Sequence, residues 1–266
     1  MRTTLSCVVL YFLLACDHVH PFIPSLPGTS YNQISVAKMT TNTPPVGFPT
    51  ELSLGAPRHR PTQSSYFTKG GVEVSCEVGE VFDASQRLES LIESLDSQKG
   101  VLFTSSYEFP GRYSRWNLGF VNPPIEFSGT ENRFTIKALN SRGRQILPAF
   151  GDILEKERRR NGGVVRESIF DEKMGKIDGS VAGSVNKFFK EEDRSRQPTL
   201  FSIVRLIIDL FYFDDDPQLG LYGAFGYDLT FQFEPIKKVL PRGDNQRDIL
   251  LYLPDELFVS DQDKKD

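Results

Sequence analysis

Hydroxyl groups, aromatic rings and guanidinium groups concentrate in one stretch of the sequence, Gly100 to Trp116, which reads GVLFTSSYEFPGRYSRW. Its first part, Val101 to Ser106, is an apolar run of β-forming residues between two turn signals, and this pattern predicts a short buried strand. Three aromatic residues and two arginines follow around a Pro-Gly turn: Tyr107, Arg112, Tyr113, Arg115 and Trp116. Donors and flat apolar surfaces beside the hydroxyls of Thr104 and Ser105 indicate a strand end that faces a ligand. An ordinary surface turn is the alternative.

Histidine and cysteine are too scarce in the body of the chain for several kinds of chemistry. All three histidines lie within the first 60 residues, so a Ser-His-Asp or Cys-His mechanism has no imidazole to take the proton of the nucleophile. Beyond the first 16 residues Cys76 is the one cysteine, so we expect no disulfide framework and no Cys/His metal cluster. Cys76 lies in a predicted strand, Val72 to Val78, and is expected to be a buried small hydrophobic residue. Any chemistry in the body of the chain would have to use carboxylates, Lys or Tyr, and we predict no catalytic or metal-binding residue.

The charge is unevenly distributed along the chain. The formal net charge is −4, but residues 1–70 carry five Lys or Arg against only Asp17 and Glu51, so the remainder carries about −7. A nucleic-acid-binding surface is expected to be basic. The acidic body thus argues against a nucleic-acid partner.

The first 70 residues have the composition of a targeting segment. The ten apolar residues from Cys7 to Cys16 are too few to cross a bilayer, which needs about 20, so residues 1–16 are predicted to be a signal peptide; a short core helix is the alternative. Residues 17–70 are rich in Ser, Thr and Pro and are predicted to be disordered. A signal peptide followed by an acid-poor, hydroxyl-rich stretch, with Phe22 as its first residue, resembles the two-part leaders that direct proteins into plastids. Secretion is the alternative, and no membrane span is expected in the mature protein.

The folded domain is predicted to comprise residues 71–266, with strands in its first half. Asp83 with Gln86 three positions later predicts the start of a helix, whose apolar face is Leu88, Leu91, Ile92 and Leu95. Three further strands are predicted at Leu118 to Val121, Ile125 to Ser128 and Arg133 to Leu139, separated by turns, with the next turn at Asn140 to Gly143. These segments predict an antiparallel meander.

The second half of the domain is expected to alternate between charged and apolar segments. Glu155 to Arg196 is predicted to be a solvated face or loop, with a short helix near Val185 to Lys190. A helix is predicted to begin at Pro198-Thr199 and to bury a broad stripe: Leu200, Phe201, Val204, Ile207, Ile208 and Phe211. Gly220 to Leu229 is predicted to be a central strand packed closely against a neighbour, and Asp248 to Leu253 is the last predicted strand, followed by Phe258 and Val259.

Four segments carry a family resemblance, and they occur in the same order as in that family: GVLFTSSYEFPGRYSRW, RFTIKALNSRG, GLYGAFGYDLTFQFEPI and QRDILLYLPDELFV. From about Leu88 to Val259 the chain resembles the amino-terminal half of anthranilate synthase component I, most closely the form fused to its glutamine amidotransferase. The resemblance implies an α+β fold, a largely antiparallel sheet with packed helices that forms one half of a two-layered sandwich.

The resemblance also implies a function and its partners. The family makes anthranilate and pyruvate from chorismate, with ammonia from glutamine, in tryptophan biosynthesis. Its catalytic acids, its histidine and its Mg²⁺-binding glutamates lie in the carboxy-terminal, chorismate-binding half. This chain is expected to be truncated before that half, to hold no cofactor and to be catalytically incompetent alone. Its expected partners are the chorismate-binding half and the glutamine amidotransferase, in cis or in trans.

The amino-terminal half of the family contributes part of a tryptophan feedback pocket through a Leu-Glu-Ser motif. The residues aligned with this motif are Phe103, Thr104 and Ser105, which form the expected effector half-site. Ser105 matches the family serine, whereas Thr104 replaces a carboxylate that can pair with an ammonium group.

Two other functions remain open from the sequence. One is a free-standing regulatory or assembly module that binds tryptophan or a separate catalytic chain. The other is a fragment of a different chorismate-utilising enzyme, such as aminodeoxychorismate synthase. If another half normally covers this one, apolar residues around Gly220 to Phe233 and Leu250 to Val259 should be exposed.

Overall fold

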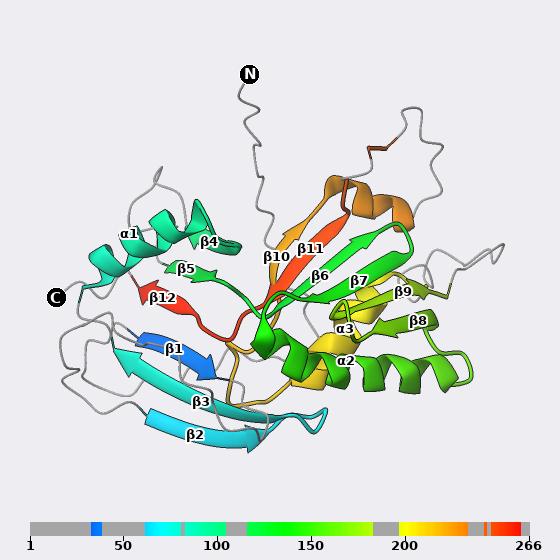
Figure 1. Cartoon of the computed structure of the whole chain (residues 1–266), viewed down its shortest axis with the longest axis horizontal. Helices are drawn as coiled ribbons and strands as arrows, with labels where there is room; N and C mark the ends of the chain where they lie inside the picture. The colour runs from blue at the N-terminus through cyan, green and yellow to red at the C-terminus, as the bar shows by residue number, and fades with distance from the viewer. Residues whose placement is uncertain are drawn as a thin grey trace.

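The computed structural model of the 266-residue chain describes residues 33–38, 62–80, 83–104, 116–182, 197–233, 242–243 and 246–261. Within these ranges the strands form three sheets, and every strand pair in them is antiparallel. Helices pack against two of the sheets (Figure 1). The predicted α+β class with a largely antiparallel sheet is confirmed.

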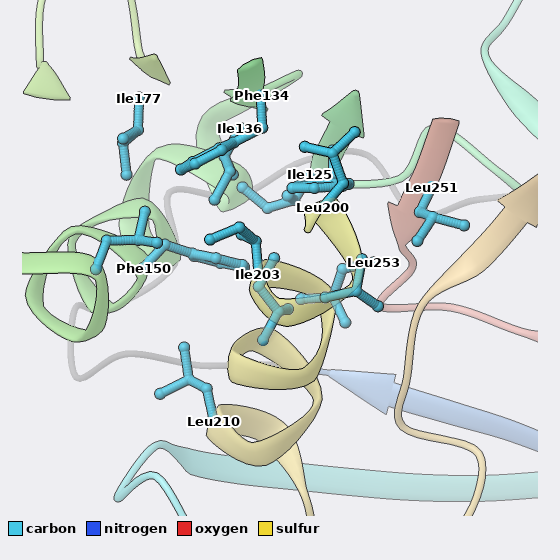
Figure 2. Packing of buried hydrophobic residues seen from close by; sticks show 14 of the residues in the cluster. Ile125, Phe134, Ile136, Phe150, Ile177, Leu200, Ile203, Leu210, Leu251 and Leu253 are labelled. Atoms are coloured by element: carbon cyan, nitrogen blue, oxygen red, sulfur yellow. The ribbon is translucent and has the colours of Figure 1, made fainter. Parts of the chain in front are cut away.

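The largest sheet has six strands in the order β10 (Tyr222–Phe225), β11 (Ile249–Leu253), β6 (Ile125–Thr130), β7 (Arg133–Ala138), β9 (Lys176–Val181) and β8 (Val165–Asp171). Helices α2 (Ser141–Arg159) and α3 (Leu200–Phe211) cover one face of it. On β7, Phe134 and Ile136 are buried while Arg133 and Lys137 are exposed, as the sequence alternation predicts. Figure 2 shows the buried residues of the sheet directed toward Ile203 of α3 and Phe150 of α2.

The second sheet has the order β12 (Phe258–Asp261), β5 (Trp116–Val121) and β4 (Gly100–Thr104). Helix α1 (Ala84–Leu95) packs on one face of it, where Leu91 meets Phe258 and Leu102. The predicted helix start is confirmed, because the Asp83 carboxylate accepts a hydrogen bond from the Gln86 amide at 2.9 Å.

The third sheet extends the folded region beyond the predicted boundary. It has the order β1 (Gln33–Lys38), β3 (Glu73–Glu80) and β2 (Thr62–Phe67), so two of its strands lie within the segment 17–70 that we expected to be disordered. The buried Thr68 donates its hydroxyl to the Leu210 carbonyl at 2.7 Å, and the Tyr66 ring stacks on Phe213 at 3.9 Å. Backbone pairing with β3 and contacts with the end of α3 thus place residues 62–70, which include few apolar side chains. Cys76 of β3 is buried, as predicted.

Helix α2 and the β8–β9 hairpin occupy the region that we expected to be a turn followed by a charged loop. Asn140 caps the helix by accepting a hydrogen bond from the Gly143 amide at 3.0 Å, and the charged run forms the last turn of the helix. Glu155 pairs there with Arg158 and Arg159, at 2.6 and 2.7 Å. The helical pattern is obscured in the sequence by a proline inside the helix and by these charges. The short helix expected near residues 185–190 lies outside the described residues.

Two predicted placements of strands are also wrong. The meander is divided, because β5 and β6 belong to different sheets; Asn122 between them has a positive φ of 52° and precedes two prolines. The glycine-rich strand β10 is at an edge of the six-stranded sheet rather than at its centre. Its close packing is confirmed, since a Cβ on Gly223 would lie 2.1 Å from the Leu250 carbonyl oxygen.

The apolar stripe of α3 is wider than the surface that covers it. Leu200, Val204, Ile207 and Phe211 are buried as predicted, but Phe201 is half-buried and Ile208 is 39% exposed. The sheet and α2 cover one side of the helix, and the outer side remains in contact with solvent.

Candidate functional site

The ligand-facing strand end predicted from the sequence lies beside an apolar layer between two sheets. We call this layer the inter-sheet cluster. It packs residues of the β12–β5–β4 sheet against the face of β10 and β11 that is turned away from α3. Its buried members are Phe120, Tyr252, Leu257 and Val259, and its partly buried members are Val101, Phe103, Leu118, Leu139, Tyr222 and Leu250.

Strand alternation separates the predicted site residues. Phe103 pairs with Leu118 on β5 and packs into the inter-sheet cluster. Thr104, the next residue, pairs with Asn117 and is exposed, because successive side chains of a strand point to opposite faces. Ser105 lies outside the described residues, as do Tyr107, Arg112, Tyr113 and Arg115 of the same stretch.

Two tyrosines give the inter-sheet cluster its polar groups. The Phe120 ring meets Tyr222 and Tyr252 edge to face, with centroids 6.1 and 6.0 Å apart, and the Tyr222 hydroxyl donates to the Gln218 carbonyl at 2.7 Å. Burial, and then the charge of Asp216, raises the pKa of Tyr222. Burial, and then the charge of Glu126 and a hydrogen bond to it, raises the pKa of Tyr252. Both phenols are therefore protonated at neutral pH and serve as hydrogen-bond donors rather than bases.

An ion pair between a buried carboxylate and an exposed lysine lies next to Tyr252 and was not predicted from the sequence. Glu126 on β6 is 5% exposed and pairs with Lys99, whose Nζ lies 2.6 Å from its Oε2. Lys99 immediately precedes β4, so the pair links the start of this strand to the six-stranded sheet. The signal available in the sequence was a single acid inside an apolar strand, which needs a cationic partner when it is buried.

A second unpredicted ion pair fixes the start of β11. Asp248 is 1% exposed and pairs with Arg242, which also lies 3.3 Å from Asp228 of the 3₁₀ helix η2 (Tyr227–Gln232). Asp248 accepts a hydrogen bond from the Glu131 amide at 2.6 Å, in the turn between β6 and β7 where Glu131 has a φ of 56°. These bonds connect η2, β11 and the β6–β7 turn.

A cavity lies away from the predicted site, and no metal-binding cluster is found among the described residues. A cavity of about 450 Å³ opens on β7, β8 and β9, lined by Arg133, Arg166, Glu167 and Ser180 among others, and includes none of the predicted site residues. Within the described ranges no group of three or more His, Cys, Asp or Glu residues is placed to hold a metal ion. No described helix has the length and apolar character needed to cross a bilayer.

The expected exposed faces are present in one segment and not in the other. In Gly220 to Phe233, Phe225 is 39% and Tyr227 is 84% exposed, as predicted, whereas Leu229 is buried. The prediction for Leu250 to Val259 is wrong, because Tyr252, Leu257, Phe258 and Val259 are buried. Strand β11 has α3 on one face and the β12–β5–β4 sheet on the other, so it has no uncovered side.

Comparison with known proteins shows which proteins this chain is similar to. No protein-family model matches the chain. It is 42% identical over 194 residues to an anthranilate synthase of Azospirillum brasilense, which covers 73% of this chain and 25% of that protein. It is 26% identical over 167 residues to anthranilate synthase component 1 of Haemophilus influenzae, covering 62% of this chain and 30% of the relative, and 23% identical over 172 residues to that of Buchnera aphidicola, covering 64% and 31%.

The chain thus spans between a quarter and a third of the length of these relatives. The resemblance identified from four sequence segments agrees with all three comparisons. Over this matched part the chain is similar to anthranilate synthase and to anthranilate synthase component 1.

Proposed function

We propose that this chain supplies the effector-binding and scaffold portion of an anthranilate synthase, in tryptophan biosynthesis from chorismate and glutamine. The observation that carries the proposal is the 42% identity to an anthranilate synthase over 194 residues. The inter-sheet cluster, of which Phe103 is a member, supports a role in packing rather than in proton transfer. Its phenols hold their protons, and the nearby carboxylate of Glu126 is neutralised by Lys99.

On this proposal the chemistry takes place in another part of the enzyme. The chorismate-binding half would supply the catalytic acids and hold Mg²⁺, and a glutamine amidotransferase would supply ammonia. Both would join this chain in cis or in trans. The chain contributes apolar packing surface and part of the tryptophan pocket.

The proposal predicts that the purified chain forms no anthranilate from chorismate, ammonium and Mg²⁺. Anthranilate fluorescence is the measurement, with the Azospirillum brasilense enzyme as a positive control under the same conditions. Anthranilate formation by the chain alone would contradict its assignment as a non-catalytic portion. Formation of 4-amino-4-deoxychorismate, without release of pyruvate, on addition of a chorismate-binding half would instead favour the aminodeoxychorismate synthase alternative.

Tryptophan is the proposed effector, held in part by Phe103, Thr104 and Ser105. The chain alone should give no measurable heat with tryptophan in calorimetry, because half a pocket leaves the ligand largely solvated. In a reconstituted enzyme, Thr104→Glu should strengthen tryptophan inhibition about tenfold, since a hydrogen bond to a charged group contributes about 1.5 kcal/mol or more. Gln98→Glu, at an exposed position after α1, is the charge-matched control. Saturable heat with the isolated chain would favour a free-standing regulatory module.

We further propose that residues 1–70 direct the protein into a plastid. A fluorescent protein carrying these residues should accumulate in that organelle. Accumulation outside the cell would instead favour the secretion alternative.

A further inference from the structure

The carboxyl end of α3 is capped by residues that precede the expected start of the folded domain. The last carbonyl groups of a helix have no partners inside the helix and need donors from elsewhere. The Leu210 carbonyl accepts hydrogen bonds from the Thr68 hydroxyl at 2.7 Å and from the Gly70 amide at 3.2 Å. The Tyr212 carbonyl accepts one from the Lys69 amide at 2.8 Å. Because Thr68 lies 142 positions before Leu210, this cap is a tertiary contact.

Side-chain contacts reinforce the backbone cap. The Tyr66 ring stacks on Phe213, with centroids 3.9 Å apart, and its hydroxyl donates a hydrogen bond to the Asp216 carboxylate. Lys69 pairs with Asp209 of α3, and the Nζ to Oδ1 distance is 2.7 Å. Aromatic packing, a hydrogen bond and an ion pair thus hold this segment, which we call the α3 cap (residues 66–70), against the end of the helix.

The fit between the α3 cap and the helix is close. A Cβ on Gly70 would lie 2.4 Å from the Leu210 carbonyl oxygen, so a residue with a side chain does not fit here without a shift of the backbone. Thr68 is 5% exposed, and its hydroxyl is satisfied by the same carbonyl. Helix α3 in turn contributes six buried residues to the main core. Loss of the α3 cap would leave the end of this helix without its donors.

We propose that the leader is cleaved before Thr62, so that the mature protein keeps β2 and the α3 cap. This inference rests on the targeting role proposed for residues 1–70, and it limits the removable part of that segment to residues 1–61. Strand β2 pairs with β3 along its whole length, so a cut after Gly70 would remove an edge strand together with the cap. The cleavage is a hydrolysis by a processing endopeptidase: water adds across one peptide bond, which leaves a carboxylate on the leader and a new amino terminus on the mature chain.

The first test measures how fast trypsin cuts the full 266-residue chain after Lys69, by mass spectrometry of the fragments. The α3 cap must leave the helix before a protease can bind it, so the rate reports the fraction of open molecules. Gly70→Ala should speed this cut about tenfold, and Thr68→Val should act in the same direction. Gly79→Ala is the matched control and should leave the rate unchanged, because its Cβ would meet nothing within 4 Å. A synthetic peptide of residues 62–75 with each substitution corrects for effects on trypsin itself.

The second test identifies the amino terminus of the mature protein, purified from cells that contain plastids, by mass spectrometry. We expect it at or before Thr62. A plastid protein that begins after Thr62 would overturn the inference and leave the targeting proposal standing. A secreted protein that begins before Thr62 would overturn the plastid proposal alone, and an uncleaved protein outside the plastid would overturn both. Equal trypsin rates after Lys69 in the wild type and in Gly70→Ala would also overturn the inference, because the segment would then not be held on α3.

Discussion

Replacing Asp248 with alanine is expected to lower the free energy of unfolding by about 3 to 5 kcal/mol, the usual cost of removing one partner of a buried ion pair. Asp248 is 1% exposed, and its partner Arg242 has a side chain that is 15% exposed. The substitution leaves the Arg242 guanidinium largely buried with its nearest counter-charge removed. It also removes the acceptor for the Glu131 amide, in a turn whose backbone has a positive φ.

Urea denaturation followed by circular dichroism measures this effect. Asp228→Ala is the control, because Asp228 is 27% exposed and lies farther from Arg242, at 3.3 Å. Its replacement should cost about 1 kcal/mol or less. A loss below 1 kcal/mol for Asp248→Ala would show that the pair does not fix the start of β11.

Phe150→Ala is expected to cost about 3 to 5 kcal/mol for a different reason, the cavity left in the core. Phe150 of α2 is fully buried between this helix, α3 and the six-stranded sheet (Figure 2). Its ring centroid lies 5.3 Å from that of Phe211. The lost contacts join both helices to the sheet, so neighbouring side chains cannot fill the space without moving a helix.

The matched control for this prediction is Met174→Ala, since Met174 is 62% exposed and its loss should change stability by about 0.5 kcal/mol or less. Thermal and urea unfolding should rank the variants in the same order. If Phe150→Ala and Met174→Ala had similar stabilities, the packing of α2 against α3 would have to be different from that described above.

Patterns within a few residues predicted the local structure well. The alternation of Phe134 and Ile136 with Arg133 and Lys137 predicted both the strand β7 and its buried face. Asp83 with Gln86, and Thr199 before an apolar run, predicted the starts of α1 and α3. These signals are readable because a cap or a strand face depends on residues next to each other in the chain.

Helix α2 was missed although its signal is also local. Ile146, Leu147, Phe150 and Leu154 form its buried face, but Pro148 interrupts the pattern and the charged residues after Leu154 are typical of a loop. Its tertiary contacts with the sheet and with α3 stabilise the helix despite the proline. Packing thus overrides a weak local preference here.

The sequence by itself determined the resemblance to anthranilate synthases, through four ordered segments. It also determined the position and apolar faces of most strands and helices in the described part of the chain. Only the tertiary structure decided that β10 is an edge strand, that β5 and β6 separate into two sheets, and that Lys99 meets Glu126 and Arg242 meets Asp248. The physical reason is that strand pairing and the Lys99–Glu126 ion pair join residues that are distant in the chain. Arg242 and Asp248 are only six positions apart, but neither helix nor strand periodicity predicts that they meet. Periodicity states which side of a strand is buried, but it does not state which strand lies beside it.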